Sequence, residues 1–282
     1  MRIDQLLVER GLAVSRSQAQ RLIAAGVQWQ QPNGEWRRVG KNRDDVPESA
    51  ALQLLDDAES RYVSRGGLKL EGALRATGVL AQGLRCLDVG QSTGGFTDCL
   101  LKHGAAQVVG IDVGHAQLHD SIREDERVIC IEGVNARELE PGDERIPDAL
   151  EGFDLMVGDV SFISLTLVLP GVVHLLKPTG QLLMLVKPQF ELQPGQVGKG
   201  GIVKDDSLYP FIEDRLRTAL MGLGMKVTAW LDSPIEGGDG NREFFVQACW
   251  PDPAAVLPAR EKARVAHEAD LAAKAYAKAN DY

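Results

Sequence analysis

The sequence predicts an α/β protein in which a mostly parallel seven-stranded sheet, with an antiparallel last strand, follows a small N-terminal α+β domain. Short apolar segments typical of buried strands alternate with helical patterns from residue 62 to residue 250. A glycine-bearing turn follows the first of these strands, at residues 90–95. The first 43 residues are instead basic and patterned as two short helices and a hairpin, which indicates a separate domain.

Length and composition are those of an ordinary globular protein. The chain has 282 residues, of which 44% are hydrophobic and 25% charged, enough for one large and one small domain. We expect domains at 1–60 and 61–252 and a tail at 253–282, with a surface helix over 259–279. The longest apolar stretch, 163–176, is shorter than the roughly 20 residues that a bilayer requires, and no signal-peptide pattern opens the chain. We therefore expect a cytoplasmic protein.

Charge is distributed unevenly along the chain. Residues 1–43 carry eight basic and three acidic side chains, a net charge of +5. The whole chain has a net charge of −9, so the remaining residues carry −14. This asymmetry favours a basic module that contacts nucleic acid on an acidic catalytic body, although an ordinary solvated helix face would also carry such charges. The four cysteines, at 86, 99, 130 and 249, lack CxxC spacing, so we expect buried thiols and no metal site.

The first 55 residues predict two helices and three short strands. Helical apolar spacing that begins at Ile3 ends at Gly11, and a second helix runs from its cap, Ser15, to Gly26. Two strand patterns, at 27–31 and 35–39, flank a Pro-Asn-Gly turn and predict a hairpin, and a closing strand is expected over 51–55. The polar residues 41–49 are expected to form an extended loop.

This segment resembles the alpha-L RNA-binding motif of a small-subunit ribosomal protein and of many pseudouridine synthases. The resemblance covers residues 1 to about 58 and rests on the pattern Arg-x-Asp-x-x-Leu-x-x-x-Gly-Leu-x-x-Ser-Arg-x-x-Ala-x-x-x-Ile-x-x-Gly. The hairpin departs from it, because Trp29, Gln30, Gln31 and Trp36 replace a short Val-x-Val-Asn-Gly turn. The resemblance implies RNA as a partner. The side chains expected to contact RNA are Arg2, Arg10, Arg16, Arg21 and Arg65.

Seven strands are expected in the second domain. They lie at residues 85–89, 107–112, 128–132, 153–158, 180–186, 225–231 and 243–250. Helical patterns separate most of them, which favours parallel pairing. The Gly-rich loop 232–242 suits a hairpin instead, so the final strand should run antiparallel to its neighbour. This arrangement resembles that of class I, Rossmann-like, S-adenosylmethionine-dependent methyltransferases.

The turn after the first strand predicts a ribose-bearing cofactor, because open parallel sheets bind nucleotide-like ligands at the carboxyl ends of their strands. Asp112 ends the next strand 22 residues beyond Gly90, close to the spacing at which an acid meets ribose hydroxyls. Ser92 breaks the dinucleotide pattern Gly-x-Gly-x-x-Gly and the turn has no Walker lysine, which favours S-adenosylmethionine. The alternatives are another nucleotide or a purely structural turn. The expected cofactor-binding residues are Asp88, Gly90, Ser92, Thr93, Gly94, Gly95, Phe96, Thr97, Asp112, Asn135 and Asp159.

Two lysines and two carboxylates are predicted to converge beside this turn. Asp159 and Lys187 each follow an apolar strand at its carboxyl end. Lys69 follows two paired glycines, and Glu243 begins the last strand. Taken singly, each could be a surface charge, and Asp159 could cap a helix. The segment 159–162, Asp-Val-Ser-Phe, lacks the paired prolines of amino-methylating enzymes and a nucleophilic cysteine, so base methylation is disfavoured.

These four residues resemble the Lys-Asp-Lys-Glu tetrad of ribose 2′-O-methyltransferases of the FtsJ fold group, and residues 1–250 resemble the TlyA, or hemolysin A, family. The supporting motifs are Ser64-Arg65-Gly66-Gly67-x-Lys69, Gly90-x-Ser92-Thr93-Gly94-Gly95-Phe96-Thr97, Asp159-Val-Ser161-Phe162 and Val197-Gly198-Lys199-Gly200-Gly201. Gln91 stands where Ala is expected, and no basic extension precedes the first helix. The resemblance implies S-adenosylmethionine-dependent methylation of a cytidine ribose in large-subunit ribosomal RNA, with small-subunit RNA as a second substrate of extended members.

A ribose 2′-hydroxyl is a poor nucleophile near neutral pH, so its proton must be removed or stabilised. The resemblance implies that Lys187 does this, that Lys69 stabilises the developing alkoxide, and that two carboxylates, Asp159 and Glu243, orient the lysines. No metal is implied, and the implied partner is ribosomal RNA in ribosomal subunits or the ribosome. The alternatives are a base-directed RNA methyltransferase, a noncatalytic RNA-binding protein and a membrane-lytic protein.

Overall fold

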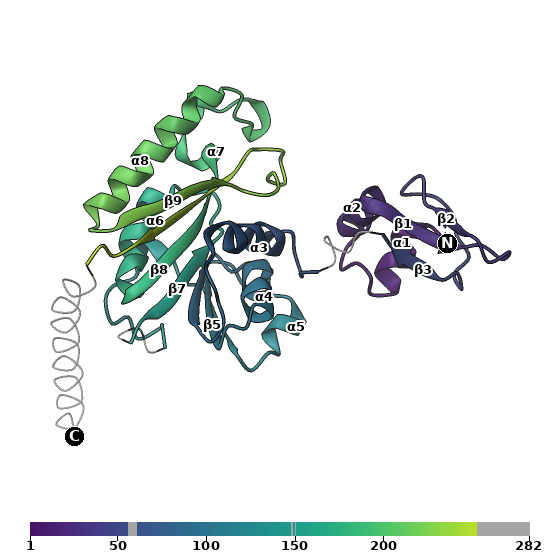
Figure 1. Ribbon diagram of the computed structural model, residues 1–282, viewed down its shortest axis with the longest axis horizontal. Helices are drawn as coiled ribbons and strands as arrows, with labels where there is room; N and C mark the ends of the chain where they lie inside the picture. Colours follow the sequence, from purple (N-terminus) through teal and green to yellow (C-terminus); the bar gives the residue numbers. More distant parts are fainter. Residues whose placement is uncertain (56–60, 148, 150, 253–282) are drawn as a thin grey trace, which may run out of the picture. The chain divides into compact units, whose positions relative to one another are not determined.

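A computed structural model describes residues 1–55, 61–147, 149 and 151–252, and these form two compact units (Figure 1). The first unit spans Met1–Leu68, and the second begins at Lys69. The tail at 253–282, with the surface helix expected over 259–279, lies outside the described residues. Within the described part of the chain, no helix is both long enough and apolar enough to span a bilayer.

The first unit is a small α+β fold, as the sequence predicts. Helices α1 (Ile3–Glu9) and α2 (Arg16–Gly26) share a buried core with an antiparallel sheet of order β2-β1-β3. The strands are β1 (Val27–Gln30), β2 (Trp36–Arg38) and β3 (Leu52–Leu54). The Ser15 side chain accepts a hydrogen bond from the backbone N–H of Gln18 at 3.2 Å, which caps α2 where the sequence predicts its start.

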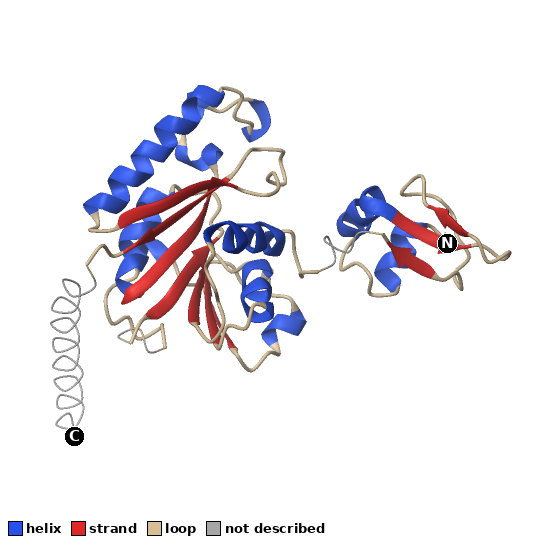
Figure 2. Cartoon of the chain, in the orientation of Figure 1, coloured by secondary structure: helices blue, strands red, loops and turns tan. Residues whose placement is uncertain are grey.

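The second unit is a seven-stranded sheet with helices on both of its faces (Figure 2). The strand order is β6-β5-β4-β7-β8-β10-β9. The strands are β4 (Arg85–Val89), β5 (Gln107–Asp112), β6 (Val128–Glu132), β7 (Phe153–Gly158), β8 (Leu176–Val186), β9 (Lys226–Asp232) and β10 (Phe244–Cys249). The α-helices are α3 (Gly66–Thr77), α4 (Gly95–Lys102), α5 (Asp120–Arg123), α6 (Leu165–Val172), α7 (Pro188–Glu191) and α8 (Tyr209–Gly222). Short 3₁₀ helices lie at Ala136–Glu138, Val173–Leu175, Pro194–Gln196, Lys199–Gly201 and Asp206–Leu208.

Strand pairing confirms the predicted topology. Strands β6, β5, β4, β7 and β8 run parallel, and β10 runs antiparallel to both β8 and β9. One boundary was wrong, because β8 begins at Leu176 and not at residue 180. Pairing of Leu176 with Phe153, followed by a register irregularity, carries the strand through the Pro178–Gly180 segment, whose residue types alone indicate a turn.

The central strands are buried because each face of the sheet is covered. Leu87 and Val89 of β4 share a core with residues of α6 and α8, whereas the alternating Asp88 meets Thr97 of α4. The cysteines only partly follow the prediction of buried thiols: residues 86 and 99 are buried, but 130 and 249 are half-buried. The two exceptions lie on the edge strand β6 and at the last position of β10, where cover is incomplete.

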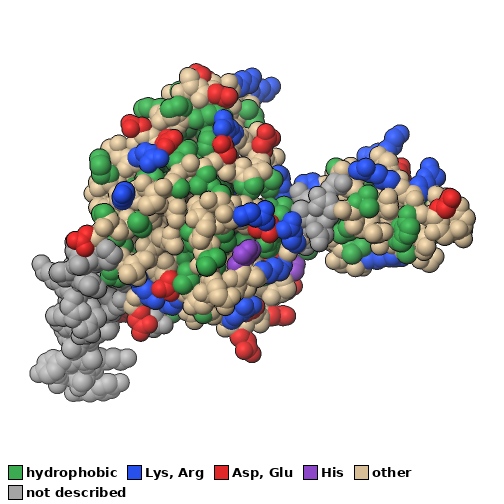
Figure 3. Space-filling model, viewed as in Figure 1, with side chains coloured by type: hydrophobic (Ala, Val, Ile, Leu, Met, Phe, Trp, Pro, Cys, Tyr) green, Lys and Arg blue, Asp and Glu red, His purple; other side chains and the backbone are tan. Residues whose placement is uncertain are grey.

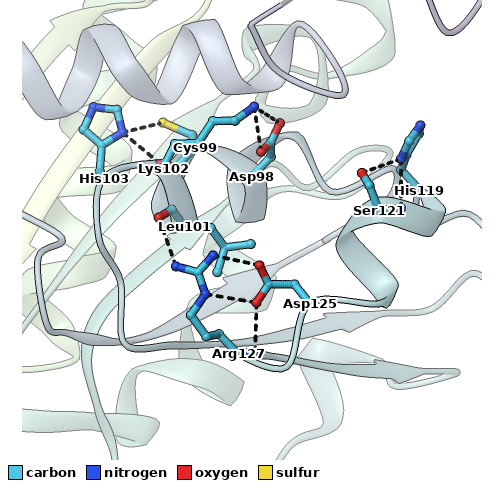
Figure 4. Close-up of polar contacts among 9 residues, drawn as sticks. All are labelled: Asp98, Cys99, Leu101, Lys102, His103, His119, Ser121, Asp125 and Arg127. Carbon is cyan, nitrogen blue, oxygen red and sulfur yellow. Dashed lines mark hydrogen bonds and ion pairs between the residues drawn. The ribbon is translucent and has the colours of Figure 1, made fainter. Parts of the chain in front are cut away.

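Side chains around α4 and the start of β6 form local ion pairs (Figure 4). Arg127 pairs with Asp125 at 2.7 Å and donates a hydrogen bond to the carbonyl of Leu101 at 3.3 Å. Within α4, Lys102 pairs with Asp98 at 3.0 Å. Because neighbouring carboxylates neutralise these cations, the contacts serve the local structure and leave little net positive charge here.

The strand register gathers several polar residues at one edge of the sheet. The last residues of β4 and β7 pair with each other, and the last residue of β8 pairs with the first residue of β10. Residues next to these positions must therefore share one edge, where open sheets bind ligands. They are Gly90, Asp159, Lys187 and Glu243.

Candidate active site

Lys187 lies between two acceptors at the end of β8. Its Nζ is 2.5 Å from Oδ1 of Asp159 and donates a hydrogen bond to Oγ of Ser161 at 2.8 Å. Both acceptors belong to the loop that follows β7, the neighbouring strand. The Lys187 side chain is therefore held by charge and by a hydrogen bond at the carboxyl edge of the sheet.

Lys69 and Glu243 form a second ion pair, which is more deeply buried. Lys69 Nζ lies 2.6 Å from Glu243 Oε2, and the two residues are 7% and 3% exposed. Burial raises the pKa of Glu243 and Asp159 raises it further, whereas Lys69 and Lys187 oppose the rise. The Glu243 carboxyl thus senses the other three charges of the predicted set. Gly237 makes room for it, since a Cβ there would lie 2.5 Å from Glu243 Oε1.

A cavity of about 320 Å³ opens at the same edge of the sheet. Five of the predicted cofactor-binding residues line it: Gly90, Ser92, Asp112, Asn135 and Asp159. The other lining residues are mostly apolar and come from the ends of β4 and β5, from the segments 113–117, 134–136 and 160–163, and from Val168 of α6. This combination of an apolar wall with a few polar groups is typical of small-molecule sites.

Asp112 organises the polar side of the cavity. Its Oδ2 accepts a hydrogen bond from the backbone N–H of Ser92, and its Oδ1 accepts one from Gly114, both at 2.7 Å. Ser92 adopts a left-handed φ of 48°, so the carboxylate stabilises an uncommon backbone conformation. Each carboxylate oxygen has a second lone pair, which can accept a hydrogen bond from a ligand hydroxyl.

Asp88 lies beneath the glycine turn and is absent from the cavity wall. It is fully buried, and its Oδ2 accepts a hydrogen bond from Thr97 Oγ1 at 2.7 Å. Burial raises the pKa of Asp88 to about 7, against the opposing effect of the Thr97 hydrogen bond. Gln91 donates a hydrogen bond to the same hydroxyl at 2.9 Å. The Gln91 side chain, larger than the expected Ala, occupies the space beside Gly110, since a Cβ on that glycine would lie 2.0 Å from it.

The glycine turn therefore separates into two groups of residues. The members that do not line the cavity are Asp88, Thr93, Gly94, Gly95, Phe96 and Thr97. They begin α4 or hold its first turn, and Gly94 has a φ of 93°, which favours glycine. These residues shape the turn whose outer residues line the cavity, and their contact with a cofactor stays a prediction.

Two side chains, Ser164 and Glu191, hold the segment that follows β7. The N-cap of α6 is Ser164, which accepts a hydrogen bond from the backbone N–H of Thr166, so the alternative that Asp159 caps this helix is wrong. Glu191, buried in α7, accepts hydrogen bonds from Ser164 Oγ at 2.6 Å and from the Leu165 N–H at 2.7 Å. This carboxylate ties the segment after Lys187 to the segment after Asp159.

The sequence interpretation gave no individual role to Ser161, Phe162 or Glu191. Phe162 lines the cavity, is 90% exposed and has a φ of 65°, and its ring lies 5.2 Å from that of Phe190. The motif containing Ser161 and Phe162 was apparent, but only the folded loops bring it next to residues 187–191. No sequence pattern indicates that Glu191 is buried or that it bonds Ser164 and Leu165.

The arginines predicted to contact RNA occupy different environments in the first unit. Arg2 pairs with Asp4 at 2.6 Å, and Arg10 donates hydrogen bonds to the backbone carbonyls of Ala50 and Glu48. Arg10 therefore joins the end of α1 to residues 48–50, whereas the Arg2 pair is local to the start of α1. Of the other three, Arg16 is exposed, and residues 21 and 65 are half-buried.

Comparison with known families gives two matches. Residues 62–249 match the FtsJ-like methyltransferase family, and residues 1–26 match the S4 domain. The first match covers the whole sheet and the four charged residues described above. The second ends before the first strand of the small unit.

Several known proteins are similar over most of the chain. The 16S/23S rRNA (cytidine-2′-O)-methyltransferase TlyA of Mycobacterium tuberculosis is 44% identical over 87% of this chain and 88% of its own. The 23S rRNA (cytidine-2′-O)-methyltransferase TlyA of Campylobacter jejuni is 35% identical over 73% and 79%. A solved structure from Streptococcus thermophilus, described as a candidate hemolysin, is 36% identical over 96% and 98%, with a TM-score of 0.66.

Proposed function

Because this chain belongs to the TlyA branch of the FtsJ-like methyltransferase family, we propose that it methylates the ribose 2′-hydroxyl of a cytidine in ribosomal RNA, using S-adenosylmethionine. The observation that carries the proposal is the pair of lysine–carboxylate contacts beside the cavity. These groups suit an oxygen nucleophile that must lose a proton. We take large-subunit RNA as the first substrate, since the names of both TlyA relatives include 23S rRNA.

The cavity fits S-adenosylmethionine in size and chemistry. Asp112 offers carboxylate lone pairs to ribose hydroxyls, and the apolar wall that includes Val134 and Ile163 suits an adenine ring. Gly90 has a φ of 81° and lets the turn pack on the loop after β7, because a Cβ there would meet the carbonyl oxygen of Asp159 at 3.1 Å. When bound, the cofactor supplies an electrophilic methyl group on a sulfonium.

Lys187 is the residue best placed to handle the hydroxyl proton. Lys187 contacts the Asp159 carboxylate as an ion pair and donates a hydrogen bond to Ser161, and a lysine nitrogen can make three such contacts. The third position is assigned to the 2′-hydroxyl of the ribose. In its neutral form the Lys187 nitrogen accepts the proton, and the Asp159 carboxylate then stabilises the ammonium that results.

The second pair supports the same step electrostatically. Lys69 is a buried cation, and Glu243 holds it by direct contact. A positive charge in a desolvated site stabilises a developing alkoxide more strongly than it would in water. Glu243 keeps Lys69 in place and keeps the net charge of the site near balance.

The proposal is tested by the chemistry of the product. Purified protein is incubated with separated large and small ribosomal subunits and methyl-labelled S-adenosylmethionine, and the RNA is digested to nucleosides for mass spectrometry. We expect label in 2′-O-methylcytidine from the large subunit. Label in a base, or no transfer to either subunit, would overturn the proposal.

A further inference from the structure

The three-stranded sheet of the first unit has one face turned away from its core. Cross-strand pairing sets Gln28 opposite Arg38 and Gln53, and Gln30 opposite Trp36. Residues paired across strands project to the same face, and side chains alternate between faces along a strand. These five side chains therefore share one face. The intervening residues Val27, Trp29, Leu52 and Leu54 pack on the core of the unit.

This outer sheet face, completed by Leu55, is open to solvent. Trp36 is 43% exposed and Leu55 is 48% exposed, although both are large apolar side chains. Arg38 is also exposed and lies beside Leu55, since a Cβ built on Gly26 would come within 3.1 Å of Leu55 and 3.5 Å of the Arg38 guanidinium. Single exposed apolar side chains are ordinary on protein surfaces, so only the chemistry of the whole face can indicate a binding site.

The outer sheet face has the chemistry of a nucleobase site. It contains three glutamines, one tryptophan, one arginine and one leucine, and no carboxylate. Glutamine amides hydrogen-bond to base edges, tryptophan stacks on bases, and arginine binds phosphate. Arg38 is the one charged side chain among these six, and its positive charge favours an anionic partner. On the visible face of the first unit, basic and apolar side chains lie side by side and acidic ones are few (Figure 3).

We propose that the outer sheet face binds unpaired nucleotides of the RNA substrate, with the Trp36 ring stacking on a base. Bases in an RNA duplex are stacked and paired, so an exposed ring selects single-stranded loops or ends. The inference rests on the proposed function only in taking RNA as the substrate. It adds a contact surface outside the S4 match, which ends at residue 26.

The test measures RNA binding by the full-length protein and its variants. The probes are a fluorescent single-stranded RNA oligonucleotide and a blunt RNA duplex of the same length. Stacking on one aromatic ring changes affinity by about 5- to 100-fold, so Trp36→Ala should weaken single-strand binding within that range and leave duplex binding unchanged. Trp36→Phe keeps a ring and should retain most of the affinity. Leu80→Ala, at an exposed apolar residue of the second unit, is the matched control and should change neither.

Each result has a definite reading. Equal single-strand affinity of Trp36→Ala and the unaltered protein overturns the inference, as does an equal loss for the duplex. If Trp36→Ala binds RNA normally but binds whole ribosomal subunits weakly, the face contacts a ribosomal protein, and the inference is again overturned. The proposed function is judged separately, since the unaltered protein can form 2′-O-methylcytidine whether or not Trp36 contributes to binding.

Discussion

At the scale of single residues, the two lysines of the site differ in their surroundings. Lys187 has one carboxylate and one hydroxyl as partners, whereas Lys69 is nearly enclosed with Glu243. A lysine that must take up and release a proton requires contact with the substrate hydroxyl. A lysine that only stabilises charge requires a fixed position and a dry environment. We therefore propose the first task for Lys187 and the second for Lys69.

Replacement of Lys187 should slow the chemistry and spare binding. Lys187→Ala is expected to lower the single-turnover rate of methyl transfer by roughly 10²- to 10⁴-fold, the usual contribution of a positioned acid or base. Lys187→Arg should not restore the rate, because guanidinium does not release its proton near neutral pH. The control is Lys177→Ala, on the same strand but paired with Asp154. Near-normal transfer by Lys187→Ala would show that this lysine is only a charge at the end of a strand.

Asp88 should give stability an unusual dependence on pH. Its pKa is raised to about 7 in the folded protein, above its ordinary value of 3.8. The folded state then binds more protons at this residue than the unfolded state does between about pH 4 and pH 7, so its contribution to the free energy of unfolding falls as the pH rises through that window. Asp88→Asn removes this dependence. The check is urea unfolding at pH 5 and pH 8: the free energy of unfolding of Asp88→Asn, relative to that of the unaltered protein, should be higher at pH 8 than at pH 5. The same difference at both pH values would contradict the assignment.

At the scale of secondary-structure elements, local patterns were sufficient for most of the fold. The alternation of apolar strands and helices predicted the parallel sheet, and the Gly-rich loop 232–242 predicted the antiparallel last strand. The early start of β8 was missed because pairing with β7 overrides the turn-forming Pro178 and Gly180. The meeting of Asp159, Lys187 and Glu243 was predictable because they flank strands whose ends share an edge, whereas Lys69 lies on α3 and was grouped with them by the family resemblance. The burial of Asp88 and the clamp at Glu191 depend on contacts between distant segments, which no local pattern encodes.

The Glu191 clamp joins the segments that follow Asp159 and Lys187. Its carboxylate accepts hydrogen bonds from Ser164 and from the N–H of Leu165, so Glu191→Ala removes the side-chain acceptor of the buried Leu165 N–H and leaves Ser164 with Thr166 as a partner. We expect a loss of about 1–3 kcal/mol in the free energy of unfolding and a slower methyl transfer. Glu191→Gln retains a hydrogen-bond acceptor, so its free energy of unfolding should fall by less.

Glu213 of α8 provides a matched control for this clamp, because it forms a surface pair with Arg217. Glu213→Ala should change the free energy of unfolding by less than about 1 kcal/mol. Chemical denaturation and single-turnover assays measure both properties. A Glu191→Ala protein as stable and as active as Glu213→Ala would show that the loops need no clamp.

At the scale of the whole molecule, the two family matches fall in different units. The S4 match and the basic residues 1–43 lie in the first unit, and the FtsJ-like sheet and its cavity lie in the second. Positive charge counted from the sequence overstates what the first unit offers to phosphate, since Arg2 and Arg10 hold its own residues. Arg16 of α2 is exposed and is a stronger candidate for a phosphate contact, and Arg21 lies on the same helix.

Removing these two charges should change the salt dependence of binding and leave the cofactor site intact. Each phosphate contact releases a counterion, so Arg16→Ala with Arg21→Ala should weaken RNA binding and lower the slope of log affinity against log salt by about 1–2. Arg10→Ala should instead destabilise the first unit, because its guanidinium bonds two backbone carbonyls. Binding titrations from low to high salt, with calorimetry of S-adenosylmethionine in parallel, distinguish these effects. If the double variant keeps the original slope, α2 does not carry the phosphate contacts and the RNA must bind elsewhere on the chain.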